Sequence, residues 1–351
     1  MTVKSVSTMG DCAMNATQPK KSMIWTEVDY EREGKQVGYL HLPHSVTRSA
    51  YGTIAIPIAV IRNGEGPTVF LMSGNHGDEY EGQIALTKLI KSLEPKHIKG
   101  RVIVMPAANL PAVMDGARVS PIDGGNLNRA FPGDAEGTPT FQISHYINTT
   151  IYPLADYHHD LHSGGSSLDY LPFCSARLGP DEDQNAKALA ALHAFGAPLS
   201  FVWAFSPDNR LAASSAIANG VIALGGEFGG CGRVSIPGVK LVERGVRNLL
   251  AHAGVLKDWK IQNDGPTRLV ELKGKDYYVY APEPGLFEPF CELGEMVKAG
   301  QPCGQVVFPD NPGRDPILCH FKRDGLLVCK RHPGRIERGD CVAHLATDRP
   351  Q

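Results

Sequence analysis

Residues 68–93 read TVFLMSGNHGDEYEGQIALTKLIKSL, and the order of patterns within this stretch decides the fold. Residues 68–72 form a short apolar run, which is typical of a buried strand. The small residues Ser73 and Gly74 then begin a turn, and residues 79–93 carry apolar side chains at helical spacing. The stretch therefore predicts a strand, a turn and a helix in succession.

The same alternation continues on both sides of this stretch. Residues 38–61 are rich in Ile, Val, Tyr and Thr and predict strands with turns near Pro43 and Gly52. Further segments fit strands at 101–106, 155–162, 199–205 and 221–224, and helices at 141–151, 183–195 and 239–256. Because crossovers through helices join parallel strands, we predict an α/β fold with a mixed, mostly parallel sheet and helices on both faces.

A second, all-β module is predicted after about residue 262. Short runs that fit strands follow one another there, separated by Gly and Pro and without a long helical period. The turn-rich sequence from Asn263 to Pro266 marks the boundary. We therefore expect a flexible N-terminal tail at 1–22, an α/β domain at 23–264 and a β-rich module at 265–351.

Length and composition exclude several classes of protein. At 351 residues the chain is long enough for two domains, and its 42% hydrophobic and 21% charged residues fit a globular protein rather than a disordered or collagen-like one. Lys and Arg total 35 against 37 Asp and Glu, so the net charge of −2 predicts neither a nucleic-acid nor a membrane partner. The longest apolar stretch, 54–61, contains Pro57 and is far shorter than the roughly 20 residues of a spanning helix.

The eight cysteines are scattered along the chain and form no Cys-x-x-Cys pair. In a chain large enough to fold without disulfides, this pattern indicates reduced thiols in the core of a cytoplasmic protein. Residues 1–22 lack the apolar segment of a signal peptide, which agrees with a cytoplasmic location.

The turn between the strand and the helix of residues 68–93 carries the pair His76 and Glu79. A spacing of three lets both side chains face one side of the first helical turn, where they could supply two ligands to a metal ion. Such a pair alone is more often a surface ion pair, so a third ligand must come from elsewhere. His162 is the candidate, because it ends a strand and precedes a loop of small residues. Asp160 lies on the same strand face and could orient an imidazole.

Two further segments carry polar side chains that suit a small-molecule site. Residues 124–133 are rich in Gly, and Asn128 and Arg129 there offer an amide and a guanidinium fork for a carboxylate. Arg118 nearby could stabilise a developing negative charge, although both arginines also fit solvated turns. Glu227 follows a predicted strand and is flanked by glycines, which suits either a general base or a solvated loop carboxylate.

Taken in order, these motifs resemble those of the succinylglutamate desuccinylase/aspartoacylase family, which is related to the zinc carboxypeptidases. The matching motifs are HGDE at 76–79, NRAFPG at 128–133, DLHSGG at 160–165 and GE at 226–227. The resemblance covers about residues 45–345 and implies a zinc-carboxypeptidase-like catalytic domain. It also implies one Zn²⁺ ion per chain, held by His76, Glu79 and His162.

The same resemblance implies the roles of the other candidates. Asn128 and Arg129 would bind the carboxylate of a small N-acylated amino acid, and Glu227 would be the general base. Arg118 would polarise the scissile carbonyl. The chain is therefore expected to be a hydrolase that acts on a linear amide.

Within the family, the length and the motif forms are most similar to the branch that acts on N-α-acetyl-L-2,4-diaminobutyrate. This likeness implies release of acetate from that compound in ectoine breakdown. Acidic N-acyl amino acids and peptide C-termini are alternative substrates, and a non-catalytic binding protein is disfavoured by the complete motif set. If the substrate carries a free ammonium, Asp115, Asp123 and Asp169 are candidate partners for it.

The predicted C-terminal module carries GEMVKAGQPCG at 294–304, which is similar to the turn pattern of biotinyl and lipoyl barrels. The module has no Met-Lys-Met motif that could carry a prosthetic group. The resemblance implies a barrel-like structural module that shapes or covers the site, and the alternative is an unrelated β module with simple glycine turns. A homodimer is the oligomeric state that we would expect.

Overall fold

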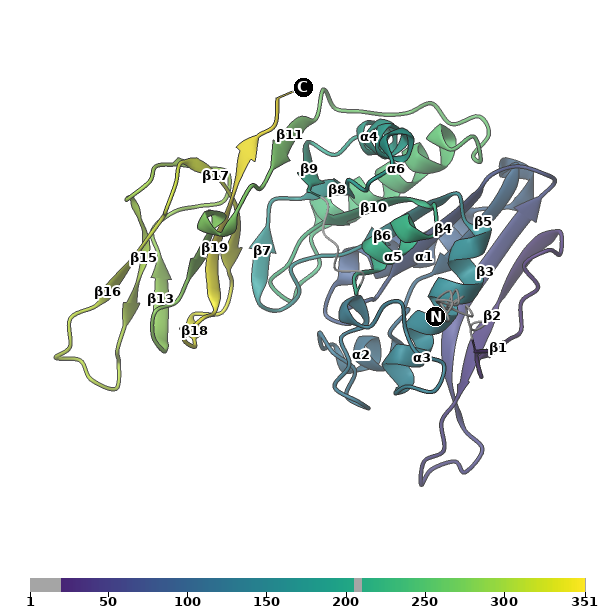
Figure 1. Ribbon diagram of the computed structural model, residues 1–351, viewed down its shortest axis with the longest axis horizontal. Coiled ribbons are helices and arrows are strands. Elements are labelled where there is room, and N and C mark those ends of the chain that lie inside the picture. Colours follow the sequence, from purple (N-terminus) through teal and green to yellow (C-terminus); the bar gives the residue numbers. More distant parts are fainter. Residues whose placement is uncertain (1–19, 205–209, 351) are drawn as a thin grey trace, which may run out of the picture.

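The computed structural model describes residues 20–204 and 210–350 of the chain (Figure 1). Strands and helices alternate from β1 (Trp25–Thr26) to α6 (Ile236–His252), and short strands from β11 (Arg268–Glu271) onward dominate the C-terminal part. Within these two ranges, no helix is both long and apolar enough to cross a membrane. The order of elements agrees with the predicted α/β region followed by a β-rich region.

Four parallel strands form the centre of the main sheet. β4 (Thr68–Ser73) pairs with β5 (Gly100–Met105) on one side and with β6 (Tyr157–Leu161) on the other, and β6 pairs with β10 (Ile222–Glu227). The carboxyl ends of the four strands therefore meet at one edge of the sheet. The segment from β4 to α1 (Tyr80–Ser92) crosses this edge, with the strand, turn and helix predicted for residues 68–93.

The sheet is more mixed than predicted. β2 (Gly34–Pro43) and β3 (Thr53–Asn63) form an antiparallel hairpin beside β5, and β8 (Phe173–Arg177) is antiparallel to β10. A turn region connects β2 to β3, and a loop with one short strand leads from β6 to β8, so neither connection is a helical crossover. The mostly parallel arrangement therefore holds for the centre of the sheet and not for its flanks.

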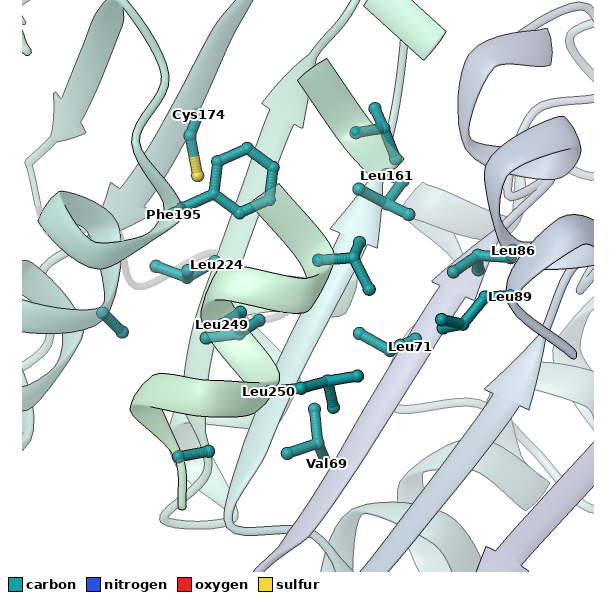
Figure 2. Packing of buried hydrophobic residues seen from close by; sticks show 14 of the residues in the cluster. Val69, Leu71, Leu86, Leu89, Leu161, Cys174, Phe195, Leu224, Leu249 and Leu250 are labelled. Atoms are coloured by element: carbon teal, nitrogen blue, oxygen red, sulfur yellow. The ribbon is translucent and has the colours of Figure 1, made fainter. Parts of the chain in front are cut away.

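Helices cover both faces of the sheet, as predicted. On one face, Val69 and Leu71 pack with α1, α4 (Glu182–Phe195) and α6 in the core cluster drawn in Figure 2. Phe70 and Met72 alternate with them and pack on the other face with α3 (Pro139–Tyr146) and α5 (Ala212–Ala218). Because β4 is buried on both faces, its sequence is apolar at consecutive positions rather than at every second one.

The large sheet continues past the predicted boundary at residue 264. β11 pairs in parallel with β9 (Leu199–Trp203) and antiparallel with β19 (Cys341–Asp348). β19 also pairs with β12 (Tyr278–Tyr280) and β17 (Gly325–Arg331), and β7 (Leu168–Tyr170) pairs with β17. With β14 (Met296–Val297), the sheet has 15 strands. Backbone hydrogen bonds thus join the regions on both sides of residue 264.

The remaining C-terminal strands form a second sheet, seen on the left in Figure 1. Its four strands follow the order β16 (Ile317–His320), β15 (Pro302–Val307), β13 (Gly285–Pro289) and β18 (Arg335–Ile336). One core cluster includes Phe287 of this sheet and Leu345 of the large sheet. The described residues form two sheets and no closed barrel, because β17 and β19 are bonded into the large sheet. The barrel-like form of the module therefore stays a prediction.

Two smaller predictions concern the N-terminal tail and the thiols. Residues 1–19 of the predicted tail lie outside the described residues, whereas the carbonyl of Lys20 accepts a hydrogen bond from His145 Nε2 at 2.9 Å. The ammonium group of Lys20 also pairs with Glu136. The seven cysteines in the described ranges are free thiols, and five of them are buried, in agreement with the expectation from the sequence.

Candidate active site

The candidate site lies at the edge of the sheet where β4, β6 and β10 end. The turn between β4 and α1 carries His76 and Glu79, and His162 directly follows β6. Glu227 is the last residue of β10, and a backbone bridge joins it to His162. The parallel pairing of these strands therefore brings together residues that are far apart in the sequence.

His76, Glu79 and His162 converge on one point. Their ligand atoms all lie within 4.8 Å of one another, and in the described part of the chain they form the only such group of three His, Cys, Asp or Glu residues. Glu79 Oε1 is 2.6 Å from Nδ1 of His76, and Glu79 Oε2 is 2.8 Å from Nδ1 of His162. Two imidazoles and one carboxylate are a known ligand set for catalytic zinc, which leaves one coordination position open.

The charges in this cluster favour a cation. Burial opposes ionisation of Glu79, but the imidazoles of His76 and His162 outweigh it and hold the pKa of Glu79 below its usual range. Burial likewise opposes protonation of His162, yet the carboxylates of Asp160 and Glu79 raise its pKa well above the usual value. The donor atoms and the buried negative charge both fit a divalent metal ion.

Hydrogen bonds on the outer ring nitrogens orient the two imidazoles. Nε2 of His162 lies 2.7 Å from Oδ2 of Asp160, which also accepts a bond from Nδ2 of Asn75 at 2.9 Å. Nε2 of His76 lies 3.1 Å from Oδ1 of Asn126. Because Nε2 of each ring is held by a hydrogen bond, Nδ1 of each ring points toward Glu79. Hydrogen-bond partners of metal-ligating histidines commonly orient the ring in this way. Asp160 thus has the geometry predicted for a residue that orients an imidazole.

Glu227 lies beside the ligand cluster with an unpaired carboxyl oxygen. Its Oε2 is buried and has no hydrogen-bond partner among the described residues. Burial and the nearby charge of Glu79 raise the pKa of Glu227 well above its usual value. A buried carboxyl group at the cavity wall beside the ligand cluster is placed to exchange protons with a bound molecule.

Arg118 approaches the same cluster from the loop after α2 (Leu110–Asp115). Its Nη1 lies 3.4 Å from Nδ1 of His76 and 3.5 Å from Oε1 of Glu79. The side chain is about half exposed, at 47%. The carbonyl of the preceding residue, Ala117, accepts a bond from the backbone of Gly77 at 2.8 Å, which ties this loop to the metal-ligand turn.

Asn128 and Arg129 reach the site from the other side. Nδ2 of Asn128 lies 3.4 Å from Nε2 of His162, and its Oδ1 accepts a bond from the backbone of Ala212 at 2.9 Å. Nη1 of Arg129 donates to the carbonyl of Asn128 at 2.6 Å. These bonds orient both side chains along the cavity wall.

A cavity of about 360 Å³ brings together the predicted metal-ligating, catalytic and carboxylate-binding residues. The seven residues singled out from the sequence are lining residues, namely His76, Glu79, Arg118, Asn128, Arg129, His162 and Glu227. A cavity of this size suits a small molecule.

Several lining residues were missed by sequence reasoning, and Arg177, Trp203 and Tyr278 are among them. Arg177 of β8 lies over the ring of Trp203 of β9 at 6.0 Å and donates to the carbonyl of Ala204 at 3.0 Å. Tyr278 of β12 comes from the C-terminal part of the chain and completes the wall. The pairing of β8 with β9 and of β12 with β19 brings them there, and no local motif in the sequence indicates it.

The predicted acidic partners of a substrate ammonium do not line this cavity. The carboxylate of Asp123 accepts bonds from the backbone and hydroxyl of Thr140, both at 2.8 Å. Asp169 lies in β7 opposite Lys330 of β17, and Asp115 ends α2. The pairing of any of these three residues with a substrate ammonium stays a prediction, which the lining of this cavity does not support. The acidic residues that line it are Glu79, Asp160 and Glu227.

The chain is similar to several known proteins over most of its length. The sequence profile of the succinylglutamate desuccinylase/aspartoacylase catalytic domain matches residues 65–253. The N-alpha-acetyl-L-2,4-diaminobutyric acid deacetylase of Halomonas elongata is 39% identical over 330 residues, which cover 94% of this chain and 96% of that protein.

Solved structures show the same relationship. A succinylglutamate desuccinylase/aspartoacylase from Rhodobacter sphaeroides is 40% identical with a TM-score of 0.89, and the match covers 93% of this chain and all of the other. The product-bound ectoine utilization protein EutE (DoeB) from Ruegeria pomeroyi is 38% identical with a TM-score of 0.90, at the same coverage. On this evidence, the chain belongs to the succinylglutamate desuccinylase/aspartoacylase family.

Proposed function

We propose that this chain is a zinc-dependent amidohydrolase that removes the acetyl group of N-α-acetyl-L-2,4-diaminobutyrate. The products would be acetate and L-2,4-diaminobutyrate, as a step of ectoine breakdown. The observation that carries the proposal is the convergence of two imidazoles, a carboxylate and the unpaired carboxyl of Glu227 on one small cavity. The named activity of the Halomonas elongata relative supports the choice of substrate.

His76, Glu79 and His162 would hold the metal ion through two Nδ1 atoms and a carboxylate. A bound zinc ion supplies a Lewis acid that polarises the acyl carbonyl and lowers the pKa of water to near neutrality. Asp160 and Asn126 would keep the two rings in place through their outer nitrogens.

Glu227 would move the protons of the reaction. It accepts a proton from the attacking water and later donates one to the departing nitrogen of the amide. The position of its unpaired carboxyl oxygen at the cavity wall beside the ligand cluster suits both steps. Arg118 would face the acyl oxygen, where its guanidinium group stabilises the negative charge that develops in the transition state.

Asn128 and Arg129 would hold the α-carboxylate of the substrate. An amide and a guanidinium group on one wall match a carboxylate by hydrogen bonding and by charge. Tyr278 and the strands after residue 264 would act as a module that narrows the opening. A narrow cavity favours a single amino acid over a peptide C-terminus and argues against a carboxypeptidase.

One observation favours a second substrate class, the acidic N-acyl amino acids. Arg177 lines the cavity in addition to Arg118 and Arg129. The acidic lining residues, Glu79, Asp160 and Glu227, all belong to the metal-ligand cluster or lie beside it. A second substrate carboxylate would complement the guanidinium groups among these lining residues. Such a substrate would use the same metal, base and carboxylate-binding residues.

A comparison of four substrates tests the proposal. We would offer N-α-acetyl-L-2,4-diaminobutyrate, its γ-acetyl isomer, N-acetylaspartate and N-succinylglutamate to the zinc-loaded protein and measure product release. Preference for the α-acetyl compound is the expected result, and Glu227→Gln should retain zinc but lose at least about a hundredfold in kcat. Activity on the acidic compounds alone would select the second class. Inactivity on all four would contradict the proposed function.

A further inference from the structure

Three acidic residues around the start of α1 contact different parts of the structure. Glu79 faces the ligand cluster, whereas Asp78 and Glu81 contact the loop at 163–166 that follows His162. Both of these carboxylates are buried, Glu81 completely. Among the described residues, no Lys or Arg forms an ion pair with Asp78 or Glu81. Other interactions must therefore stabilise these two buried carboxylates.

Hydrogen bonds hold the 163–166 loop at both of its ends. Oε2 of Glu81 accepts a bond from Oγ of Ser163 at 2.5 Å, at the start of the loop. Oδ2 of Asp78 accepts bonds from the backbone and the hydroxyl of Ser166, at 2.7 and 2.9 Å, at its end. We call this arrangement of Asp78, Glu81, Ser163 and Ser166 the carboxylate clamp. The positive end of the α1 dipole also favours negative charge at this place.

The clamp contacts the metal-ligand side of the site directly. The backbone N–H of Ser163 donates to Oε2 of Glu79 at 3.1 Å, and the same oxygen lies 2.8 Å from Nδ1 of His162. Ser163 therefore bonds Glu79 through its backbone and Glu81 through its side chain. A shift of this residue would move His162 relative to Glu79.

The clamp also contacts the side of the site that carries Glu227. The backbone N–H of Gly164 donates to the carbonyl of Gly229 at 3.0 Å. Oε1 of Glu81 accepts a bond from the backbone of Ser235, which caps α6, at 2.7 Å. A Cβ atom on Gly229 would lie only 2.4 Å from Oε1 of Glu81, so glycine there makes room for the carboxylate. The segment after Glu227 is thus packed on the same side chain as the loop after His162.

We propose that Glu81 is a positioning residue. It fixes the position of His162 relative to Glu79, and it fixes the segment after Glu227 relative to these two ligands. Asp78 holds the other end of the loop in the same way. The inference rests on the proposed metal-binding function, because its consequence is a ligand geometry ready for zinc. Glu81 is not a lining residue of the cavity, and its hydrogen bonds join it to Ser163 and Ser235, so it would act through these two residues.

The test compares zinc binding in variants of the full chain. Glu81→Ala removes both acceptors, whereas Glu81→Gln keeps the shape, with an oxygen for Ser235 and an amide that can donate to the Ser163 hydroxyl. Ser163→Ala removes the hydroxyl that Glu81 accepts from, and it tests the same hydrogen bond if Glu81→Ala does not fold. Glu182→Gln is the matched control, because Glu182 is an exposed acidic residue in the first turn of α4.

The readouts are the zinc dissociation constant by chelator competition, kcat and the melting temperature of the metal-free protein. We expect the zinc dissociation constant to rise about 10- to 100-fold in Glu81→Ala. The rise should be smaller in Ser163→Ala, and Glu81→Gln should have a dissociation constant between those of Glu81→Ala and the wild type. Wild-type zinc affinity and kcat in both Glu81→Ala and Ser163→Ala, with only a lower melting temperature, would overturn the inference.

The same measurements separate this inference from the proposed function. If the wild type binds zinc but hydrolyses none of the four substrates, the proposed function fails, and weaker zinc binding in the Glu81 variants still supports the positioning role. If the wild type binds no zinc, both are overturned.

Discussion

His344 in β19 is a buried histidine with no hydrogen-bond partner on either ring nitrogen among the described residues. Its ring stacks on Tyr278, with centroids 4.5 Å apart and planes 4° from parallel, and lies beside Trp203 at 6.3 Å. Burial lowers the pKa of His344 to about 3. The residue is therefore a neutral aromatic ring near pH 7, and it supports two side chains that line the cavity.

This neutral histidine predicts a pH-dependent stability. In the unfolded chain His344 takes up a proton near its usual pKa of 6.5, but in the folded chain only near 3. Its contribution to stability is complete above pH 6.5 and is lost as the pH falls toward 3. His344→Phe keeps the ring and removes the titration. Between pH 7.5 and 5.0 the wild type should lose about 2 kcal/mol more unfolding free energy than this variant.

Urea unfolding at the two pH values measures the difference. His193→Gln is the control, because His193 is exposed in α4 and should leave the pH dependence of the wild type unchanged. Parallel pH profiles for the wild type and His344→Phe would contradict the prediction.

Residues differ in how far the sequence alone reveals them. His76 and Glu79 were predictable because their spacing of three is a local pattern, although both lie in the turn before α1 and not on its first helical turn. His162 was predictable because it ends a strand before small residues. Arg177 and Tyr278 could not be predicted, because strand pairing brings them to the cavity. The three aspartates do not line the cavity, because nearness to a motif in sequence does not fix where a side chain lies in the fold.

At the scale of elements, the packing of α6 depends on a glycine. Gly238 lies near the start of the helix, where a Cβ atom would be 1.9 Å from the carbonyl oxygen of Phe228. The same atom would be 3.0 Å from Cγ of Glu81 in α1. The helix can therefore approach the segment after Glu227 only because this position has no side chain.

Gly238→Ala should destabilise the protein although alanine favours helices. The gain in helix propensity is about 1 kcal/mol, whereas overpacking against backbone typically costs 1–3 kcal/mol and sometimes more. We expect a net loss of unfolding free energy in urea titrations. Lys240→Ala, at an exposed position of the same helix, should stay within about 0.5 kcal/mol of the wild type. If Gly238→Ala were more stable than the wild type, the backbone near Phe228 would have to accommodate the added Cβ atom without loss of unfolding free energy.

Element boundaries were predictable where the end signals are local. Gly196 ends α4 in a left-handed conformation with φ of 76°, as its place after residue 195 predicts, and Asp181 caps the start. The helix predicted at 141–151 instead begins at Pro139 and passes into a π-helical turn at Ile147–Ile151. Apolar spacing does not encode that change in hydrogen bonding. The antiparallel flanks of the sheet likewise depend on connections that no single segment specifies.

At the scale of the whole molecule, Tyr278 connects the strands after residue 264 to the cavity. Tyr278→Ala should raise KM for the preferred substrate about tenfold, which corresponds to about 1.4 kcal/mol of binding free energy. The zinc content should not change, because no contact given for the described residues joins Tyr278 to His76, Glu79 or His162. Tyr51→Ala is the control, since Tyr51 is 99% exposed between β2 and β3. An unchanged KM would show that the C-terminal wall does not contact the substrate.

The overall division into an α/β region and a β-rich region was predictable from composition and periodicity. The continuity of the sheet across residue 264 was not, because β9, β11 and β19 pair over long sequence separations. The turn-rich residues 263–266 mark a change of pattern along the chain and not a break in hydrogen bonding.

This continuity has a consequence for the order in which the protein can be made. Synthesis proceeds from the N-terminus, so the metal-ligand turn and Glu227 leave the ribosome well before β19 (Cys341–Asp348). Until β19 emerges, β11 lacks one neighbour and Tyr278 lacks the ring of His344 on which it stacks. A nascent chain therefore acquires its metal ligands first and the wall of its cavity last.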